Sequence, residues 1–473
     1  MVGSRTWIAD IALFPTIGRR SKLHRAIDNR GPPEEIARLL DNGADINAVQ
    51  VHSLYGTALT KAIAVHNTQI VSLLLDRGAD INVVGSQYGS ALAAAVVMHS
   101  TQIVSLLLDR GADVNAVGGR YGTALTAAVF IESIGMVSLL LDRGADINAV
   151  GGRYGTALAA AVSTKSIDMV SLLLDRGADI NKLGGECGTA LVAAVHGKRK
   201  DIVLLLLDRG ADINLVSGQY GTALAAAVFR KSTSIVSLLL DRGADINMVS
   251  GKYGTALAAA AFCRSTNMVS LLLDRDADIN TVGGDYGTAL AAAVFVKSMD
   301  IVSLLLDRGA DINRVGGIYG TALAAAAFCG NTDIMLLLLD RGADINTVGG
   351  EYGTALAVAA LGEKTQIVSL LLGRGANIDR EGGKYGTALA AAAYCGSTDV
   401  VSLLLEHGAD FMHVGGGGSY STTSGVYPGV LHVARSEGSK AGPTLLALLE
   451  TTIRKQNELD LVTKMMKELR LRP

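Results

Sequence analysis

Short blocks of small apolar residues alternate along the chain with blocks of bulky apolar residues, and polar segments separate them. In residues 121–153, the block ALTAAVF directly follows Thr123, and the block MVSLLLDR follows a five-residue turn, IESIG. Thr123 can cap the first block, because a threonine hydroxyl accepts a hydrogen bond from a free helix N–H. The second block has leucines at helical spacing, and Gly144 follows where a left-handed residue commonly ends a helix. The pattern predicts an alanine-rich helix, a turn, a leucine-rich helix and an extended exit, ADINAVGGR.

This unit recurs every 33 residues, so that eleven copies cover 55–417. The repeated tyrosine of Tyr-Gly-Thr-Ala-Leu marks each copy, and Cys187 takes its place once. Glycine-rich turns that open a helix can bind phosphate. However, eleven copies in register indicate architecture, and the Lys-Ser/Thr pair of a nucleotide loop is absent. The tyrosines are Tyr55, Tyr88, Tyr121, Tyr154, Tyr220, Tyr253, Tyr286, Tyr319, Tyr352 and Tyr385.

Neither predicted helix can bury its apolar surface alone, so neighbouring units must stack. The sequence therefore predicts an all-α repeat protein, a solenoid of turn-helix-turn-helix units. Because alanine helices make a thinner layer than leucine helices, we expect a curved array with the alanine helices on its concave side.

The unit resembles the ankyrin repeat, a 33-residue turn followed by two helices whose signature is Thr-Pro-Leu-His-x-Ala. Here Thr-Ala-Leu-Ala-Ala-Ala stands at the signature, and LLLDRGADIN is similar to the family's second helix and exit. Sequences that begin at His24 and Leu431 look like degenerate flanking repeats. The predicted domains are an extension (1–20), a degenerate repeat (21–54), eleven regular repeats (55–417), and a segment with a Gly/Ser-rich insertion, a capping repeat and a C-terminal helix (418–473). The Gly-Gly-x-Tyr-Gly-Thr-Ala-Leu variant is similar to ankyrin arrays of filamentous fungi.

The composition narrows the classes of function. A net charge of −2 gives no general attraction to nucleic acid or anionic lipid, and no apolar run is long enough to cross a membrane. Cys263, Cys329 and Cys395 occupy one repeat position, two repeats apart, too far for a disulfide or a shared metal. We expect free thiols, an intracellular protein of the cytoplasm or nucleus, and no cofactor or metal.

Catalysis needs a few unlike residues that converge at one place, and the eight histidines are scattered without a plausible nucleophile or acid partner. The resemblance implies a non-enzymatic scaffold that binds a protein partner along its concave face, as a monomeric array. Two alternatives stay open. One is a recognition subunit of a larger fungal-type signalling or metabolic system. The other is a basic ridge that binds acidic tails or, less in keeping with the charge, nucleic acid.

The residue before each Tyr-Gly varies most between the copies, and we call these the tip residues. Residues that are the same in every copy hold neighbouring repeats together, whereas residues that vary can select a ligand. The tips are therefore candidate ligand contacts. The alternative is that they are solvent-exposed and have no role in binding. In five consecutive repeats a cation stands eleven residues after the tyrosine position, and we call this row the basic ridge; local pairing with acids three residues later is the competing explanation. The candidate tips are Gln219, Lys252, Asp285 and Ile318, and the ridge is Lys165, Lys198, Lys231, Arg264 and Lys297.

Five of the chain's seven phenylalanines share the position nine residues after the tyrosine. They either line an open groove as aromatic anchors or fill space beside alanine helices as part of the core. We expect the partner to contact the tips and this aromatic row between about residues 219 and 330. The row consists of Phe130, Phe229, Phe262, Phe295, Phe328 and Tyr394.

Two further expectations concern the exit of each repeat. Asp276 replaces the glycine that ends the second helix, and a left-handed aspartate costs about 1 kcal/mol relative to glycine. The Arg of each DRG and the Asp of each GAD form charged rows, for which we expect local pairs such as Arg143 with Asp146 and Arg176 with Asp179.

Overall fold

The computed structural model describes residues 22–50, 55–410, 429–435 and 439–455. The described residues form two compact units that divide between Gln219 and Tyr220, and each unit is described by itself. The predicted extension, the Gly/Ser-rich insertion and the end of the C-terminal helix lie outside the described residues.

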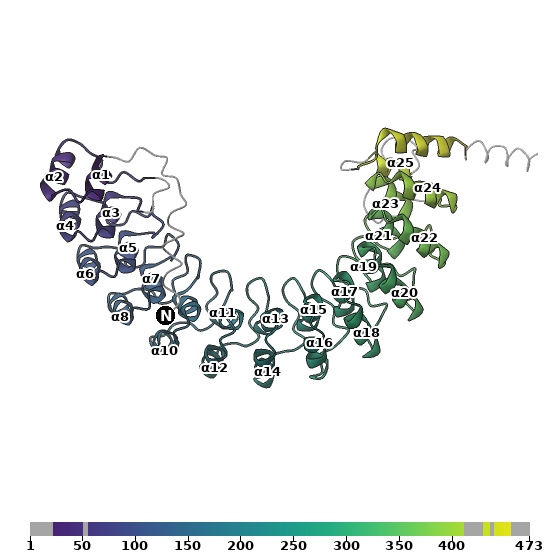
Figure 1. Ribbon diagram of the computed structural model, residues 1–473, viewed down its shortest axis with the longest axis horizontal. Helices are drawn as coiled ribbons and strands as arrows, with labels where there is room; N and C mark the ends of the chain where they lie inside the picture. Colours follow the sequence, from purple (N-terminus) through teal and green to yellow (C-terminus); the bar gives the residue numbers. More distant parts are fainter. Residues whose placement is uncertain (1–21, 51–54, 411–428, 436–438, 456–473) are drawn as a thin grey trace, which may run out of the picture. The chain divides into compact units, whose positions relative to one another are not determined.

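The first unit contains six pairs of helices, each an odd-numbered helix followed by an even-numbered one (Figure 1). The odd-numbered helices are α1 (Lys22–Asp28), α3 (Ala58–Ala64), α5 (Ala91–Val97), α7 (Ala124–Phe130), α9 (Ala157–Thr164) and α11 (Ala190–His196). The even-numbered helices are α2 (Pro33–Asp41), α4 (Thr68–Asp76), α6 (Thr101–Asp109), α8 (Ile134–Asp142), α10 (Ile167–Asp175) and α12 (Lys200–Asp208).

The second unit continues the same alternation. Its odd-numbered helices are α13 (Ala223–Phe229), α15 (Ala256–Phe262), α17 (Ala289–Phe295), α19 (Ala322–Cys329), α21 (Ala355–Leu361), α23 (Ala388–Cys395) and α25 (Gly429–Ala434). Its even-numbered helices are α14 (Thr233–Asp241), α16 (Thr266–Leu273), α18 (Met299–Asp307), α20 (Thr332–Asp340), α22 (Thr365–Gly373) and α24 (Thr398–Glu406). A further helix covers residues 443–455.

Within each unit the helices form two rows, and the connecting turns project beyond the odd-numbered row (Figure 1). Inside a unit, successive odd-numbered helices pack on one another, and each of them up to α23 also packs on the even-numbered helix that follows it. In α5, residues 91–96 are all buried, whereas α6 buries only Ile103, Val104 and Leu107. The small residues of the odd-numbered helices therefore allow close packing on every side. The even-numbered helices pack through one apolar face only. This arrangement confirms the predicted all-α solenoid.

The predicted helix ends are also present. The hydroxyl of Thr123 accepts a hydrogen bond of 3.1 Å from the N–H of Thr126, and Gly144 is left-handed with a φ of 87°. Asp276 is left-handed as well, with a φ of 64°. One boundary was wrong: α8 begins at Ile134, inside the expected turn, because the N–H of Val137 already bonds to the carbonyl of Ser133.

The flanking segments attach to the regular repeats through backbone carbonyls. His24 is buried in α1, and its Nε2 lies 3.3 Å from the carbonyl oxygen of Gly56. At the other end, the N–H of Lys440 and the hydroxyl of Ser439 both bond to the carbonyl of Tyr394. These contacts agree with flanking repeats, whose exact boundaries stay predictions.

Candidate partner-binding surface

The tip residues of successive repeats are joined backbone to backbone. In the second unit, the N–H of each tip donates to the carbonyl of the tip before it, at 2.7–2.9 Å from Asp285 to Lys384. In the first unit, Arg120 donates to Gln87 and Arg153 donates to Arg120 in the same way. The turns thus form a continuous run over these repeats, in which side chains can vary while the backbone stays fixed.

This close approach explains the Gly-Gly pairs. Gly317 has a φ of 69°, and a Cβ built on it would lie 2.6 Å from the carbonyl oxygen of Asp285 in the neighbouring turn. Side chains are excluded there both by the left-handed backbone and by the space. The glycine-rich run is therefore a contact between repeats, in agreement with the architectural interpretation.

The candidate tips are mostly exposed. The side chains of Gln219, Lys252 and Ile318 face solvent, and that of Asp285 is half-buried. Gln219 is the last residue of the first unit, whereas the other three lie in the second. The structure therefore leaves these variable side chains available to a ligand, and their role in binding stays a prediction.

The aromatic row is neither bare nor fully buried. The four phenylalanines of the row in the second unit are half-buried, and Phe229, Phe262 and Phe295 each lie between the tyrosine of their own repeat and that of the next. Neighbouring ring centroids are 4.7–5.8 Å apart, within the range of favourable aromatic pairs. We call this run the aromatic ladder: Tyr220, Phe229, Tyr253, Phe262, Tyr286, Phe295, Tyr319 and Phe328.

Sequence reasoning identified the phenylalanines but missed the tyrosines as the alternate members of the ladder. The signal was available, since each tyrosine precedes its phenylalanine by nine residues across the predicted first helix. Burial raises the pKa of Tyr319 to about 12, and the nearby Cys329 thiol and neighbouring tyrosines add to the effect. The phenol of Tyr319 therefore remains neutral at physiological pH.

The first unit has only a short version of the ladder. Phe130 lies between Tyr121 and Tyr154, with ring centroids 5.2 and 5.4 Å away. Ser163, Cys187 and His196 then replace the rings, and residues 155–219 contain no phenylalanine, tyrosine or tryptophan. A stacked repeat therefore does not require the rings.

A second apolar row was also missed by sequence reasoning. In most repeats the residue four positions before the tyrosine position is apolar, and seven of these residues, together with Val49 in the flanking repeat, are 42–52% exposed. They nevertheless cover the next turn, since a Cβ on Gly151 would lie 2.6 Å from Cγ1 of Val117. The signal was the fixed apolar residue in an otherwise polar exit. These residues are Val49, Val84, Val117, Val150, Leu183, Val216, Val249 and Val315.

The basic ridge occupies a left-handed backbone position at the end of the odd-numbered helices. All five residues have φ between 53° and 69°, and all five side chains are exposed. The competing explanation, local pairing, was wrong: within the described part of the chain none of the five forms an ion pair, and Asp201 pairs with Arg199. The ridge belongs to both units, with Lys165 and Lys198 in the first and the other three in the second.

The charged rows at the exit pair differently from the expectation. Arg143 pairs with Asp109, and Arg176 pairs with Asp142, each an acid of the preceding repeat. The expected partner Asp146 instead accepts a hydrogen bond from the N–H of Asn148. The arginine reaches this acid because its side chain extends toward the end of the leucine-rich helix of the preceding repeat.

The Asn of each exit links repeats as well. The side-chain oxygen of Asn280 accepts a hydrogen bond of 2.7 Å from the N–H of Asp311 in the following repeat. Asn115 bonds to Asp146 in the same way in the first unit. The fixed letters of GADIN are thus structural, and they leave recognition to other positions.

The cysteines are free and half-buried, as expected. Burial raises the pKa of the Cys263 thiol, which the nearby Lys231 partly opposes. Burial likewise raises the pKa of Cys329. These thiols remain protonated at neutral pH and act as small apolar groups.

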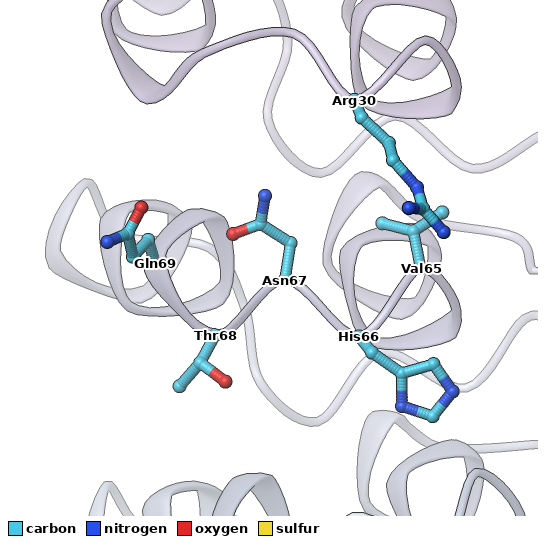
Figure 2. A pocket seen from close by; sticks show the side chains of 6 residues that line it. All are labelled: Arg30, Val65, His66, Asn67, Thr68 and Gln69. Carbon is cyan, nitrogen blue, oxygen red and sulfur yellow. The ribbon is translucent and has the colours of Figure 1, made fainter.

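A shallow hollow lies between the first two helix pairs (Figure 2). Arg30 extends over Val65, while the ring of His66 points away from Arg30. The side chain of Asn67 already accepts a hydrogen bond from the N–H of Ile70. The hollow therefore lacks the convergent buried polar groups of a ligand site.

The described residues contain no group of three or more His, Cys, Asp or Glu side chains that could hold a metal ion. No helix among them has both the length and the apolar character that a membrane span requires.

Comparison with known proteins agrees with the geometry. The family of ankyrin repeats, described in blocks of three copies, matches residues 23–118, 119–184, 190–282, 223–316, 284–349 and 323–414. A curated relative, "Ankyrin repeat and SOCS box protein 6" of Pongo abelii, is 36% identical over 75 residues. That match covers 14% of this chain and 18% of the relative, so the two share only a short part of their lengths. With the paired helices, the left-handed exits and these matches over most of its length, the chain belongs to the ankyrin-repeat family.

Proposed function

We propose that this chain is a non-enzymatic protein-interaction array whose partner binds along the tips and the adjoining ends of the odd-numbered helices. Ankyrin repeats are generally protein-binding modules without catalytic activity. One observation supports the proposal: the fixed residues of each repeat form contacts between repeats, whereas most of the variable tips are exposed. We further propose that the protein acts as a monomer inside the cell, in the cytoplasm or nucleus.

The aromatic ladder supports the same surface. Half-buried rings keep part of their area accessible while their neighbours fix their orientation. Rigid aromatic side chains bury much area at low entropic cost, which suits them as anchors in an interface. We propose that Phe229, Phe262, Phe295 and Phe328 contribute contacts beneath the tips Lys252, Asp285 and Ile318, and that Gln219 does so at the end of the first unit.

A matched pair of substitutions tests this surface. Ile318 at a tip and Met299 at the start of α18 are each 37% exposed. The tagged full chain and its Ile318→Ser and Met299→Ser variants are used to capture partners from native extract, with quantification by mass spectrometry. We expect stoichiometric protein partners to decrease with Ile318→Ser and to persist with Met299→Ser. Equal capture by both variants would contradict binding at the tips.

The basic ridge is a second candidate surface. Its cations are exposed and lack ion pairs within the described residues, and each occupies a left-handed position at a cost of about 1 kcal/mol relative to glycine. A row of unpaired cations suits an acidic tail or, as the weaker option, nucleic acid. Replacing all five residues by glutamine should remove the salt dependence of partner binding. An unchanged salt dependence would contradict the ridge.

The remaining alternative is a recognition subunit of a larger signalling or metabolic system. It uses the same surface, and the same capture experiment distinguishes it. A partner that itself carries catalytic machinery supports this alternative, whereas several non-enzymatic partners support a scaffold.

A further inference from the structure

Five consecutive tips of the second unit have a symmetric order of side chains. Along the chain they are a cation, an anion, an apolar residue, an anion and a cation. None of the four charged tips forms an ion pair with another described residue, and Ile318 is a large apolar side chain that is 37% exposed. The residues are Lys252, Asp285, Ile318, Glu351 and Lys384.

The spacing of these tips is fixed by the backbone. Each tip from Asp285 to Lys384 donates a hydrogen bond of 2.7–2.9 Å to the tip before it. The rings of Tyr319 and Tyr352, each next to a tip, have centroids 6.3 Å apart. The backbones of successive tips therefore lie closer together than the roughly 8–10 Å that separates packed helix axes.

This spacing selects the shape of a ligand. An extended strand rises about 3.2–3.4 Å per residue, so its alternate side chains lie roughly 6.4–6.8 Å apart on one face. An α-helix repeats its face every 5.4 Å or so, which is shorter than the 6.3 Å between the tyrosine rings beside Ile318 and Glu351, so a helix would lose register along a row of tips. An extended peptide therefore stays in register with the tips over a longer distance than a helix.

We infer that the tips of the second unit bind an extended peptide segment whose alternate side chains are acidic, basic, apolar, basic and acidic. The inference rests on the proposed function and specifies its partner. The acidic residues face Lys252 and Lys384, the basic residues face Asp285 and Glu351, and the apolar residue packs on Ile318. Because the order is the same from either end, the segment can bind in both directions.

Two peptides of identical composition test the inference on the unmodified full chain. The matched peptide is Glu-Thr-Lys-Thr-Val-Thr-Lys-Thr-Glu, and the control, Lys-Thr-Glu-Thr-Val-Thr-Glu-Thr-Lys, exchanges the two charges. Fluorescence anisotropy of labelled peptides gives the two Kd values. We expect the matched peptide to bind about tenfold more tightly, since four attractive pairs become four like-charge pairs in the control. The preference should weaken as salt is added.

A charge-exchanged protein provides the converse measurement. The variant Lys252→Glu, Asp285→Lys, Glu351→Lys and Lys384→Glu should prefer the control peptide instead. Equal Kd values for both peptides, including no measurable binding of either, overturn the inference. They leave the proposed function standing if Ile318→Ser still reduces partner capture. Equal capture by the Ile318→Ser and Met299→Ser variants would instead contradict the proposed function itself.

Discussion

The two ends of each repeat hold their neighbours in different ways. At the tips, backbone meets backbone, so that Gly317 has no room for a Cβ. At the exit that follows the leucine-rich helix, Gly309 has a φ of 90° but nothing within 4 Å of its missing Cβ. The contacts between exits are made by exposed ion pairs and by asparagine side chains. Glycine is thus required at the tips because a side chain has no space there. At the exits it is favoured only because the backbone is left-handed.

The largest difference should come from the two glycines themselves. Gly317→Ala combines a left-handed alanine with a collision against the neighbouring carbonyl, and we expect a loss of about 3 kcal/mol in the free energy of unfolding. Gly309→Ala should cost only about 1 kcal/mol, because strain of the backbone is the sole penalty. Denaturant unfolding monitored by hydrogen exchange measures both. Equal losses would show that the turns are not in close contact.

The aromatic ladder should contribute less than the glycines of the tips. Replacing Phe262 and Phe295 together by serine, the residue that stands at Ser163, removes two half-buried rings and their contacts with three tyrosines. We expect the free energy of unfolding to fall by about 2 kcal/mol. The matched substitution Phe130→Ser in the first unit should cost about half as much. If the double variant were as stable as the unmodified chain, the rings would serve binding alone.

At the exit, the sign of the effect reverses for Asp276. Because this residue is left-handed with a φ of 64°, Asp276→Gly should raise the free energy of unfolding by about 1 kcal/mol. The reverse change, Gly309→Asp, should lower it by a similar amount. Thermal melting of both variants provides the check, and an unchanged melting temperature for Asp276→Gly would show that aspartate meets no strain there.

The ion pairs at the exit should give the smallest effect. Arg143 and Asp109 are both substantially exposed, and exposed pairs contribute about 0–1 kcal/mol. A double-mutant cycle between these residues should give a coupling energy of about 0.5 kcal/mol that salt reduces. The cycle between Arg143 and Asp146 should give none. Coupling with Asp146 would restore the local pair that the sequence suggested.

The sequence was sufficient to predict what one repeat does by itself. The Thr123 cap, the left-handed Gly144 and the left-handed Asp276 follow from the preferences of single residues at helix ends. The start of α8 at Ile134 was not predicted. It depends on where the backbone before the helix is extended, and the pattern of apolar and polar residues predicts such boundaries poorly.

Contacts between repeats could be predicted less well. In a periodic sequence Arg143 has acids before and after it at regular intervals, so spacing along the chain cannot distinguish Asp109 from Asp146. The spacing of the tips could not be predicted from the pattern either. Packed helices lie roughly 8–10 Å apart, but the turns of successive repeats approach closely enough for their backbones to form hydrogen bonds. The tyrosine–phenylalanine alternation was missed for the same reason: its members come from different repeats.

The hydrogen bonds between successive tips have a consequence for how such a chain can change. Each of these bonds is formed by equivalent atoms of equivalent residues, so within such a run a whole unit of 33 residues can be duplicated or deleted without creating a new kind of junction. Near-identical copies in a gene are also prone to recombine with one another. Each such event would lengthen, shorten or reorder the series of tip side chains while the backbone that supports it remained the same.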